Sequence, residues 1–249
     1  MCGRYVMARA VGDLVADFGA ELEEEFQLQP SWNIAPTTDV PILLERLVDG
    51  EKHRQLHVAR WGLIPGWAKD PGIGVKMFNA RSETVLEKPS FRAAIKSRRC
   101  AVPADGYYEW KKGEGKTKQP YYVHPATGSG IVFAGLYEWW KDPAKEDGAP
   151  DRWVLSTSII TTAAPSPDSQ DPVLAELGAL HDRLPVPLSK EALGDWLDPE
   201  AKDIPGLVEL IRAQANEVAT TWTLDAVGSA VGNVRNNSAE LITPEEALF

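Results

Sequence analysis

Cysteine and histidine are scarce in this sequence, with two Cys and four His among 249 residues. Cys2 and Cys100 are too few for the disulfide framework of a small secreted protein, and their spacing from the histidines does not match a zinc site. No stretch reaches the roughly 18 to 20 apolar residues of a membrane span. The first residues also lack the apolar core of a signal peptide. We therefore expect a soluble, cytoplasmic protein with no metal and no membrane contact.

Internal repeats, low-complexity linkers and Gly-rich phosphate loops are missing as well, so a repeat architecture and a nucleotide cofactor have no support. The content of 43% hydrophobic and 25% charged residues is typical of a globular chain with a real core. Strand-like runs fill the middle of the chain and helix-like runs flank them. This order predicts one α+β domain over residues 1–249, with a mostly antiparallel, barrel-like β core flanked by helices.

Individual elements follow from local patterns. The dipeptide Asp49-Gly50 suits a tight hairpin turn between two apolar-rich runs. Helices are predicted at 13–18, 90–98, 189–196 and 205–215, the second of them basic and capped by Ser90. Strands are predicted at 41–48, 53–61, 100–110, 119–124, 131–139 and 152–162.

The charge distribution is uneven. The whole chain carries a net charge of −10, but residues 76–112 hold nine basic and four acidic residues, a net +5 against −15 elsewhere. A basic face on an acidic body suits a short stretch of phosphate backbone without indiscriminate attraction to polyanions. An ordinary solvated helix face at 91–99 is the simpler interpretation of the same run.

Cys2 is a candidate nucleophile. Removal of Met1 would place an α-amino group and a thiol on adjacent carbons, and this 1,2-aminothiol condenses with an aldehyde to an imine that closes to a thiazolidine. Ordinary pKa values of about 7.7 to 8.0 for the amine and about 8.5 for the thiol make both nucleophiles accessible near neutral pH. The structural alternative is a small residue at a frayed terminus.

Three further motifs carry polar groups. Asn79 and Arg81 precede the basic run and could hold a sugar hydroxyl and a phosphate. Glu109 lies in the aromatic run 106–110, where alternation sends Tyr107 and Glu109 to one face and Tyr108 and Trp110 to the other. His181 lies beside an acid, a base and a proline turn, which suits a general acid or base. An edge-strand ion pair for Glu109 and a structural histidine are the alternatives, and we interpret His53, His57 and His124 as structural.

Aromatic rings and prolines are concentrated at 32–37 and 61–67. Some of the nine Trp belong to the core, but others could stack on bases, and such stacking contributes about 1 to 3 kcal/mol per base whatever the sequence. These segments therefore predict contact with single-stranded nucleic acid.

Taken together, these motifs resemble the SOS response-associated peptidase (SRAP) family of abasic-site processing proteins. The likeness runs through Met1 to Arg4, the segments 32–37, 61–67, 79–84, 106–110 and 181–185, and 231–236 with 240–242. The resemblance implies one domain that captures an abasic site in single-stranded DNA as a covalent thiazolidine with Cys2, after self-removal of Met1, and so shields the site from strand cleavage. Catalytic roles are implied for Cys2, Asn79, Glu109 and His181, and DNA contacts are expected from Arg4, Pro36, Trp61, Trp67, Arg81 and Trp110.

The same interpretation predicts a monomer that needs neither metal nor organic cofactor, associates with the nucleoid when bound to DNA, and has abasic single-stranded DNA as its partner. Two other functions stay open on the sequence. One is an N-terminal-nucleophile cysteine peptidase acting on proteins in trans, with Cys2 and His181 as its reactive pair. The other is a plain single-strand-binding module, which would give salt-sensitive binding and no covalent product.

Overall fold

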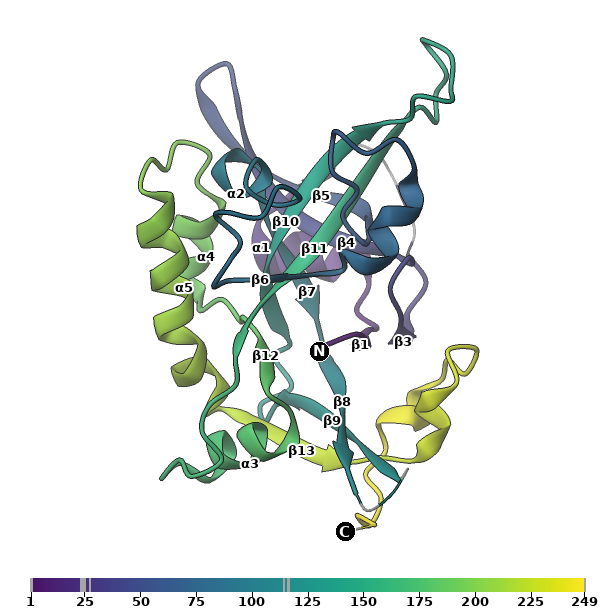
Figure 1. Cartoon of the computed structure of the whole chain (residues 1–249), viewed down its shortest axis with the longest axis vertical. Helices are drawn as coiled ribbons and strands as arrows, with labels where there is room; N and C mark the ends of the chain where they lie inside the picture. The colour runs from purple at the N-terminus through teal and green to yellow at the C-terminus, as the bar shows by residue number, and fades with distance from the viewer. Residues whose placement is uncertain (1, 23–25, 27, 114, 116, 249) are drawn as a thin grey trace.

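The structure is a computed structural model that describes residues 2–22, 26, 28–113, 115 and 117–248. These residues form two β-sheets (Figure 1). The larger sheet contains, in spatial order, β12 (Arg183–Pro185), β11 (Trp153–Ala163), β10 (Ile131–Lys141), β7 (Arg99–Ala104), β4 (Asp39–Val48), β5 (Glu51–Trp61) and β2 (Glu21–Leu22), with β6 (Asn79–Arg81) beside β11.

This larger sheet closes on itself. β5, β4, β7, β10 and β11 pair in turn, all antiparallel, and a parallel contact between β11 and β5 completes the ring. The closing contact brings Ser156 opposite Arg60 and Thr157 opposite Trp61. The predicted mostly antiparallel, barrel-like core is therefore confirmed. Completely buried side chains on its strands include Leu43, Leu56, Val102, Phe133 and Ile159.

The hairpin between β4 and β5 has the predicted turn. Asp49 and Gly50 both have positive φ, 51° and 86°, as a two-residue turn with the twist of the flanking strands requires. Ten consecutive residue pairs then match along the two strands, from Val48 opposite Glu51 to Asp39 opposite Arg60. The turn thus sets the register of the longest hairpin in the ring.

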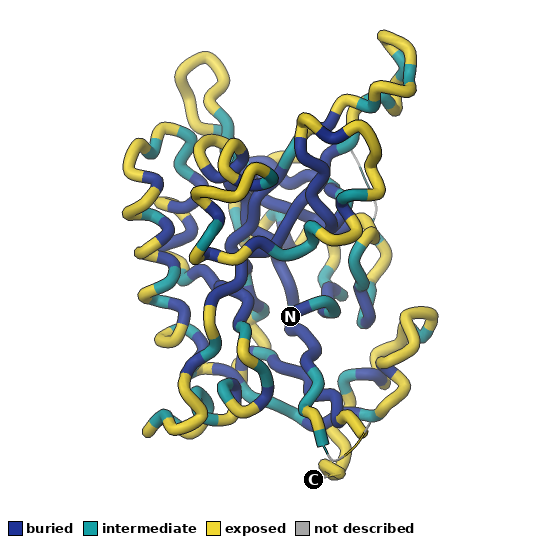
Figure 2. The backbone as a smooth tube through the Cα atoms, in the orientation of Figure 1, coloured by how far each residue is buried: buried dark blue, intermediate teal, exposed yellow. Residues whose placement is uncertain are grey.

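The smaller sheet has the order β13 (Trp222–Ala226), β9 (Lys118–Pro125), β8 (Gly106–Lys112), β1 (Tyr5–Met7) and β3 (Ser31–Ile34). β1 lies between β8 and β3 and pairs antiparallel with both. The start of the chain is therefore built into the middle of the fold, with buried backbone around it (Figures 1 and 2).

Helices flank the strands as expected. The predicted helices at 13–18, 189–196 and 205–215 correspond to α1 (Val11–Phe18), α4 (Lys190–Leu197) and α5 (Ile204–Ala219). α4 and α5 lie together on one side of the ring (Figure 1). The described residues also form the helix α3 (Pro172–Leu180) and the short 3₁₀ helices η1 (Pro71–Lys76), η2 (Ser229–Gly232) and η3 (Ala239–Ile242).

The predicted basic helix at 90–98 is confirmed only in its second half. Only α2 (Ala94–Ser97) is helical, and Ser90 does not cap it, because its N-cap is Ala93 without a side-chain bond. Residues 84–93 instead form successive turns that bury Phe91.

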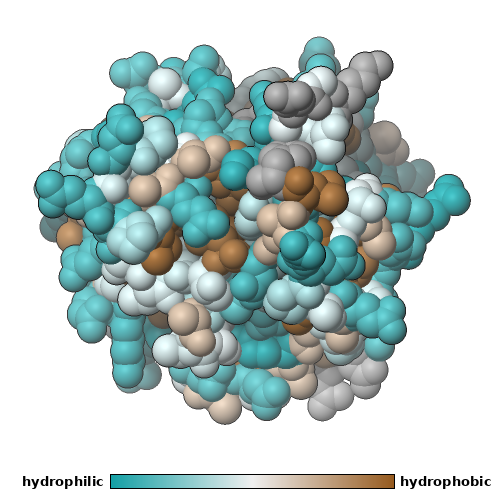
Figure 3. Space-filling model, turned by 90° about the horizontal axis from the view of Figure 1, so that it is seen from below, coloured by the Kyte–Doolittle hydropathy of each residue, from teal (hydrophilic) through white to brown (hydrophobic). Residues whose placement is uncertain are grey.

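No helix in the described ranges is long and apolar enough to cross a membrane. Seen from below, hydrophobic side chains appear in small separate areas among hydrophilic ones (Figure 3).

Candidate active site around Cys2

Cys2 lies in the main hydrophobic core with only 1% of its surface exposed. Its carbonyl oxygen accepts a hydrogen bond from Nδ2 of Asn79 at 2.8 Å. Burial raises the pKa of the thiol well above its ordinary value, the nearby Glu109 carboxylate adds to this, and a hydrogen bond from the Arg4 backbone opposes it. The thiol is therefore a protonated group in an enclosed site. Met1, whose removal the resemblance implies, lies outside the described residues.

Asn79 reaches Cys2 because β6 adds to the ring as a short parallel strand. β6 pairs with β11 so that Asn79 lies opposite Ile159 and Arg81 opposite Thr161. The Nδ2 group of Asn79 holds the start of the chain, whereas its Oδ1 atom is buried and has no hydrogen-bond partner among the residues described. An unpaired acceptor beside Cys2 can take a hydrogen bond from an incoming hydroxyl or amine.

Glu109 lies on β8 with the predicted alternation. Tyr107 belongs to the main core together with Cys2, whereas Tyr108 belongs to a second cluster that Trp110 packs against. Glu109 is only 6% exposed. Burial is the main cause of the raised pKa of the Cys2 thiol and of the Tyr107 phenol, and the charge of Glu109 raises both further. A buried carboxylate within electrostatic reach of the thiol is thus present.

His181 follows the last residue of α3. Its Nδ1 atom lies 2.9 Å from the backbone nitrogen of Arg183 and 2.8 Å from Oδ1 of Asp182. One ring nitrogen cannot accept a hydrogen bond from the first and donate one to the second at the same time. The Arg183 N–H can only donate, so Nδ1 is its acceptor, and the side chain of Asp182 is 86% exposed.

His181 and Asn79 are joined through three neighbouring strands. β12, which follows His181, pairs with β11, and β11 pairs with β6. Arg183 crosses β11: it donates to the Thr161 carbonyl at 2.8 Å and forms a two-point ion pair with Glu83. The sequence analysis did not assign a role to Arg183 or to this pair, although both partners lie within the motifs it quoted.

Arg4 is held in place by the other end of the chain. Its Nη1 atom donates to Oδ1 of Asn33 and to the carbonyl of Val231, both at 2.7 Å, and its guanidinium lies 5.7 Å from the centre of the Trp110 ring. Asn33 is buried and also donates to three carbonyls of the C-terminal segment, those of Val231, Asn233 and Asn236. The sequence analysis missed Asn33, which lies within the quoted segment 32–37.

The aromatic residues expected to contact DNA occupy different environments. Trp61 is completely buried between Tyr5 and Phe78, and its Nε1 donates to the Phe78 carbonyl at 2.9 Å. A ring without exposed surface cannot stack on a base, so Trp61 is a core residue in this structure. Trp67 is 58% exposed, with Nε1 3.4 Å from the Pro89 carbonyl, and Pro36 is half-buried.

The basic segment 76–112 has less charge at the surface than its sequence suggests. Arg99 is buried and donates to four carbonyls around α2 and the end of α4, and Arg98 forms an ion pair with Glu138 at 2.9 Å. The exposed bases of the segment are Lys76, Arg81, Lys88, Arg92, Lys96 and Lys112. Arg81 is thus an exposed base at the end of β6, the strand whose Asn79 binds the Cys2 carbonyl.

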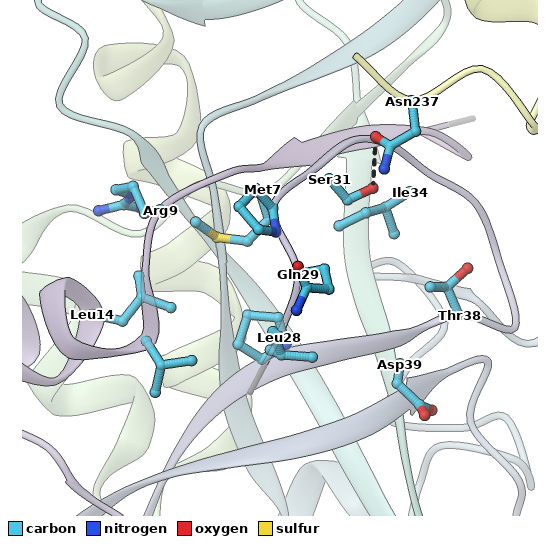
Figure 4. A pocket seen from close by; sticks show the side chains of 13 residues that line it. Met7, Arg9, Leu14, Leu28, Gln29, Ser31, Ile34, Thr38, Asp39 and Asn237 are labelled. Atoms are coloured by element: carbon cyan, nitrogen blue, oxygen red, sulfur yellow. Dashed lines mark hydrogen bonds between the residues drawn. The ribbon is translucent and has the colours of Figure 1, made fainter. Parts of the chain in front are cut away.

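A separate cavity of about 270 Å³ lies at the other end of β1, where Met7, Ile34 and Leu14 line it (Figure 4). The C-terminal segment reaches its rim, since Oδ1 of Asn237 lies 3.4 Å from the Ser31 hydroxyl.

Across the described part of the chain, no group of three or more His, Cys, Asp or Glu side chains could hold a metal ion. Cys2 and Cys100 are both free thiols.

Comparison with known proteins gives a consistent result. Residues 1–234 match the family model described as SOS response associated peptidase (SRAP). The chain is 38% identical to the abasic site processing protein YoqW of Bacillus subtilis over 97% of this chain and 99% of that protein. It is 32% identical to the abasic site processing protein YedK of Escherichia coli, covering 98% and 100%. A crystal structure of a protein from Bacteroides thetaiotaomicron matches with a TM-score of 0.77 and 26% identity, covering 98% of this chain and all of that one.

Proposed function

Because this chain belongs to the SOS response associated peptidase (SRAP) family, we propose that it processes abasic sites in single-stranded DNA by forming a covalent thiazolidine with Cys2. One observation carries the proposal: Asn79 holds the Cys2 carbonyl at 2.8 Å inside an enclosed site that also contains the Glu109 carboxylate. A chain start fixed in this way suits a nucleophile better than a frayed terminus does.

The chemistry begins after Met1 is removed. An abasic deoxyribose is mostly a closed ring, and His181 assists its opening to the aldehyde by moving a proton. The free α-amino group of Cys2 then adds to the aldehyde carbon, and loss of water gives the imine. Because burial keeps the thiol protonated, the amine reacts first.

Ring closure follows on the same carbon. Glu109 accepts the thiol proton as the sulfur adds to the imine carbon, and the imine nitrogen gains a proton, which completes the five-membered ring. Closure protects the strand, because an open imine favours β-elimination of the phosphate. The unpaired Oδ1 of Asn79 holds a sugar hydroxyl, and Arg81 and Arg4 neutralise flanking phosphates.

The test is the intact mass of the protein after incubation with a single strand that carries one abasic site. The wild-type protein should begin at Cys2 and gain the mass of the strand minus one water. Cys2→Ala should form no adduct, and Cys2→Ser should form no stable ring. A wild-type protein that cleaves peptides but gives no adduct would favour the peptidase alternative, and salt-sensitive binding without an adduct would favour the binding module.

A further inference from the structure

The Tyr5 side chain contains an unexplained polar atom. Its ring is completely buried, and its hydroxyl has no hydrogen-bond partner within residues 2–22, 26, 28–113, 115 and 117–248. The hydroxyl of Tyr108, on the adjacent strand, instead donates to the Trp32 carbonyl at 2.9 Å. A buried hydroxyl without a partner lowers the stability of a fold, and each such group in a native structure calls for a specific explanation.

Tyr5 faces the reaction site. β1 and β8 pair so that Tyr5 lies opposite Tyr107, and Glu109, two residues farther along β8, points to the same face. The edge-on contact with Trp61, at 5.1 Å between ring centres, fixes the phenol ring. Cys2 belongs to the same core cluster as both tyrosines and is itself only 1% exposed. A sugar that bonds to Cys2 must therefore displace part of the packing around it and come to the face on which Tyr5, Tyr107 and Glu109 lie.

The Tyr5 phenol is suited to donate a hydrogen bond. Burial raises the pKa of Tyr5 well above its ordinary value, and a charge on Cys2 raises it further. The group therefore keeps its proton at neutral pH and cannot serve as a general base. A neutral phenol held in a fixed position in a dry site can donate a hydrogen bond to an oxygen that gains negative charge.

We propose that the Tyr5 hydroxyl is a further catalytic group of the Cys2 site, donating a hydrogen bond to the sugar oxygen at the carbon that Cys2 attacks. This inference rests on the proposed function. As the amine nitrogen bonds to the aldehyde carbon, the C=O electron pair moves to the oxygen, which later gains two protons and leaves as water. Tyr5 stabilises the charge on that oxygen and transfers no proton of its own.

The test is the variant Tyr5→Phe, which removes only the hydroxyl. We expect adduct formation with abasic single strands to slow at least about tenfold, toward the roughly 10²- to 10³-fold loss on removal of one oxyanion donor. Affinity for an intact single strand should stay unchanged. The melting temperature should stay the same or rise, because an unpaired buried hydroxyl is lost. The control Tyr137→Phe removes a hydroxyl that is hydrogen-bonded to Arg46, so it should lower the melting temperature and leave the adduct rate alone.

Three results would overturn the inference: a wild-type adduct rate for Tyr5→Phe, a rate loss matched by an equal loss of affinity for intact strands, or a lower melting temperature, which would mean that the hydroxyl has a structural partner. Each of these requires that the wild-type protein forms the adduct. A wild-type protein that forms none would instead refute the proposed function, so the two failures are distinguishable.

Discussion

Arg183 and Glu83 form a two-point ion pair, with Nη1 2.8 Å from Oε1 and Nη2 2.9 Å from Oε2. The pair spans β11 and joins the turn after Asn79 to the strand after His181. Two motifs about 100 residues apart in the sequence are thereby fixed to each other. Asn79 and His181, for which we propose roles in holding and opening the sugar, are linked through this contact.

Glu83→Gln tests the pair through its pH dependence. Burial alone would raise the Glu83 pKa, but the hydrogen bond and charge of Arg183 lower it to about 2, from 4.5 in the unfolded chain. A lowered pKa stabilises the fold fully above about pH 4.5, and this contribution is lost as the pH falls toward 2. The stability difference between wild type and Glu83→Gln, measured by chemical denaturation, should shrink over that range. Glu209→Gln, at an exposed pair with Arg212, should show no such trend, and a pH-independent difference for Glu83→Gln would contradict the prediction.

Asn33→Ala should release the C-terminal segment. The change removes one donor from three carbonyls of that segment, of which only that of Asn236 has no second donor among the described residues, and it removes the Oδ1 acceptor of Arg4. We expect the free energy of unfolding to fall by about 2 to 4 kcal/mol, and limited proteolysis to cut residues 229–242 faster. Asn216→Ala, at an exposed position on α5, is the control and should change neither. Equal proteolysis of both variants would mean that Asn33 does not hold the segment.

Trp67→Ala should weaken binding to intact single strands without affecting the fold. The ring is 58% exposed, and the loss of one stacked base corresponds to about 1 to 3 kcal/mol, or roughly a 5- to 150-fold loss of affinity. Trp153→Ala is the matched control. Trp153 is similarly exposed, at 53%, but it lies on the β10–β11 hairpin, outside the aromatic segments 32–37 and 61–67 that are expected to contact DNA. Fluorescence anisotropy with a labelled strand measures both. If the two variants lose the same affinity, stacking is not specific to Trp67.

Arg81→Ala should lower affinity for intact single strands and reduce its salt dependence. Loss of one phosphate contact changes the slope of log K against log salt by about 0.7 for single strands. The measurement is a salt titration of wild type and variant. Arg212→Ala, at a partly exposed base on α5, should leave the slope unchanged. An unchanged slope for Arg81→Ala would remove Arg81 from the DNA contacts.

Glu109→Gln and His181→Ala should slow adduct formation more than they affect DNA affinity. Each removes a proton-transfer group, and such groups typically contribute about 10²- to 10⁴-fold in rate. By microscopic reversibility, His181→Ala should also slow release of the adduct. Time courses in both directions, with a trapping competitor for release, give the rates, and His53→Ala, at a partly exposed pair with Glu21, serves as control. Wild-type rates in both variants would mean that Cys2 and its amine suffice.

Sequence patterns correctly predicted the structural features that depend only on neighbouring residues. The turn at Asp49-Gly50 and the alternation of Tyr107, Tyr108 and Glu109 on β8 depend on neighbouring residues alone. The parallel contact between β5 and β11 joins residues nearly 100 positions apart, and no local signal specifies it. The helix predicted at 90–98 is present only at Ala94–Ser97, and turns that contain the buried Phe91 precede it.

At the candidate site, residue type alone does not reveal which side chains are accessible. Trp61 and Trp67 occur in one short aromatic run, yet the first is completely buried and the second is 58% exposed. Arg99 likewise counts toward the positive charge of its segment, but its guanidinium is buried and donates hydrogen bonds to backbone carbonyls. Motif resemblance identified Cys2, Asn79, Glu109 and His181 as candidates, whereas Asn33, Arg183 and Tyr5 became evident only from their hydrogen bonds or from the lack of one.

The bond between Arg4 and the Val231 carbonyl spans 227 residues, and this separation affects how the protein is made. At about 5 to 20 residues per second, a ribosome needs roughly 10 to 45 s to travel from one to the other. During that interval the beginning of the nascent chain exists without the segment that holds Arg4. The contacts that hold Arg4, two residues from Cys2, can therefore form only after nearly all of the protein has been translated.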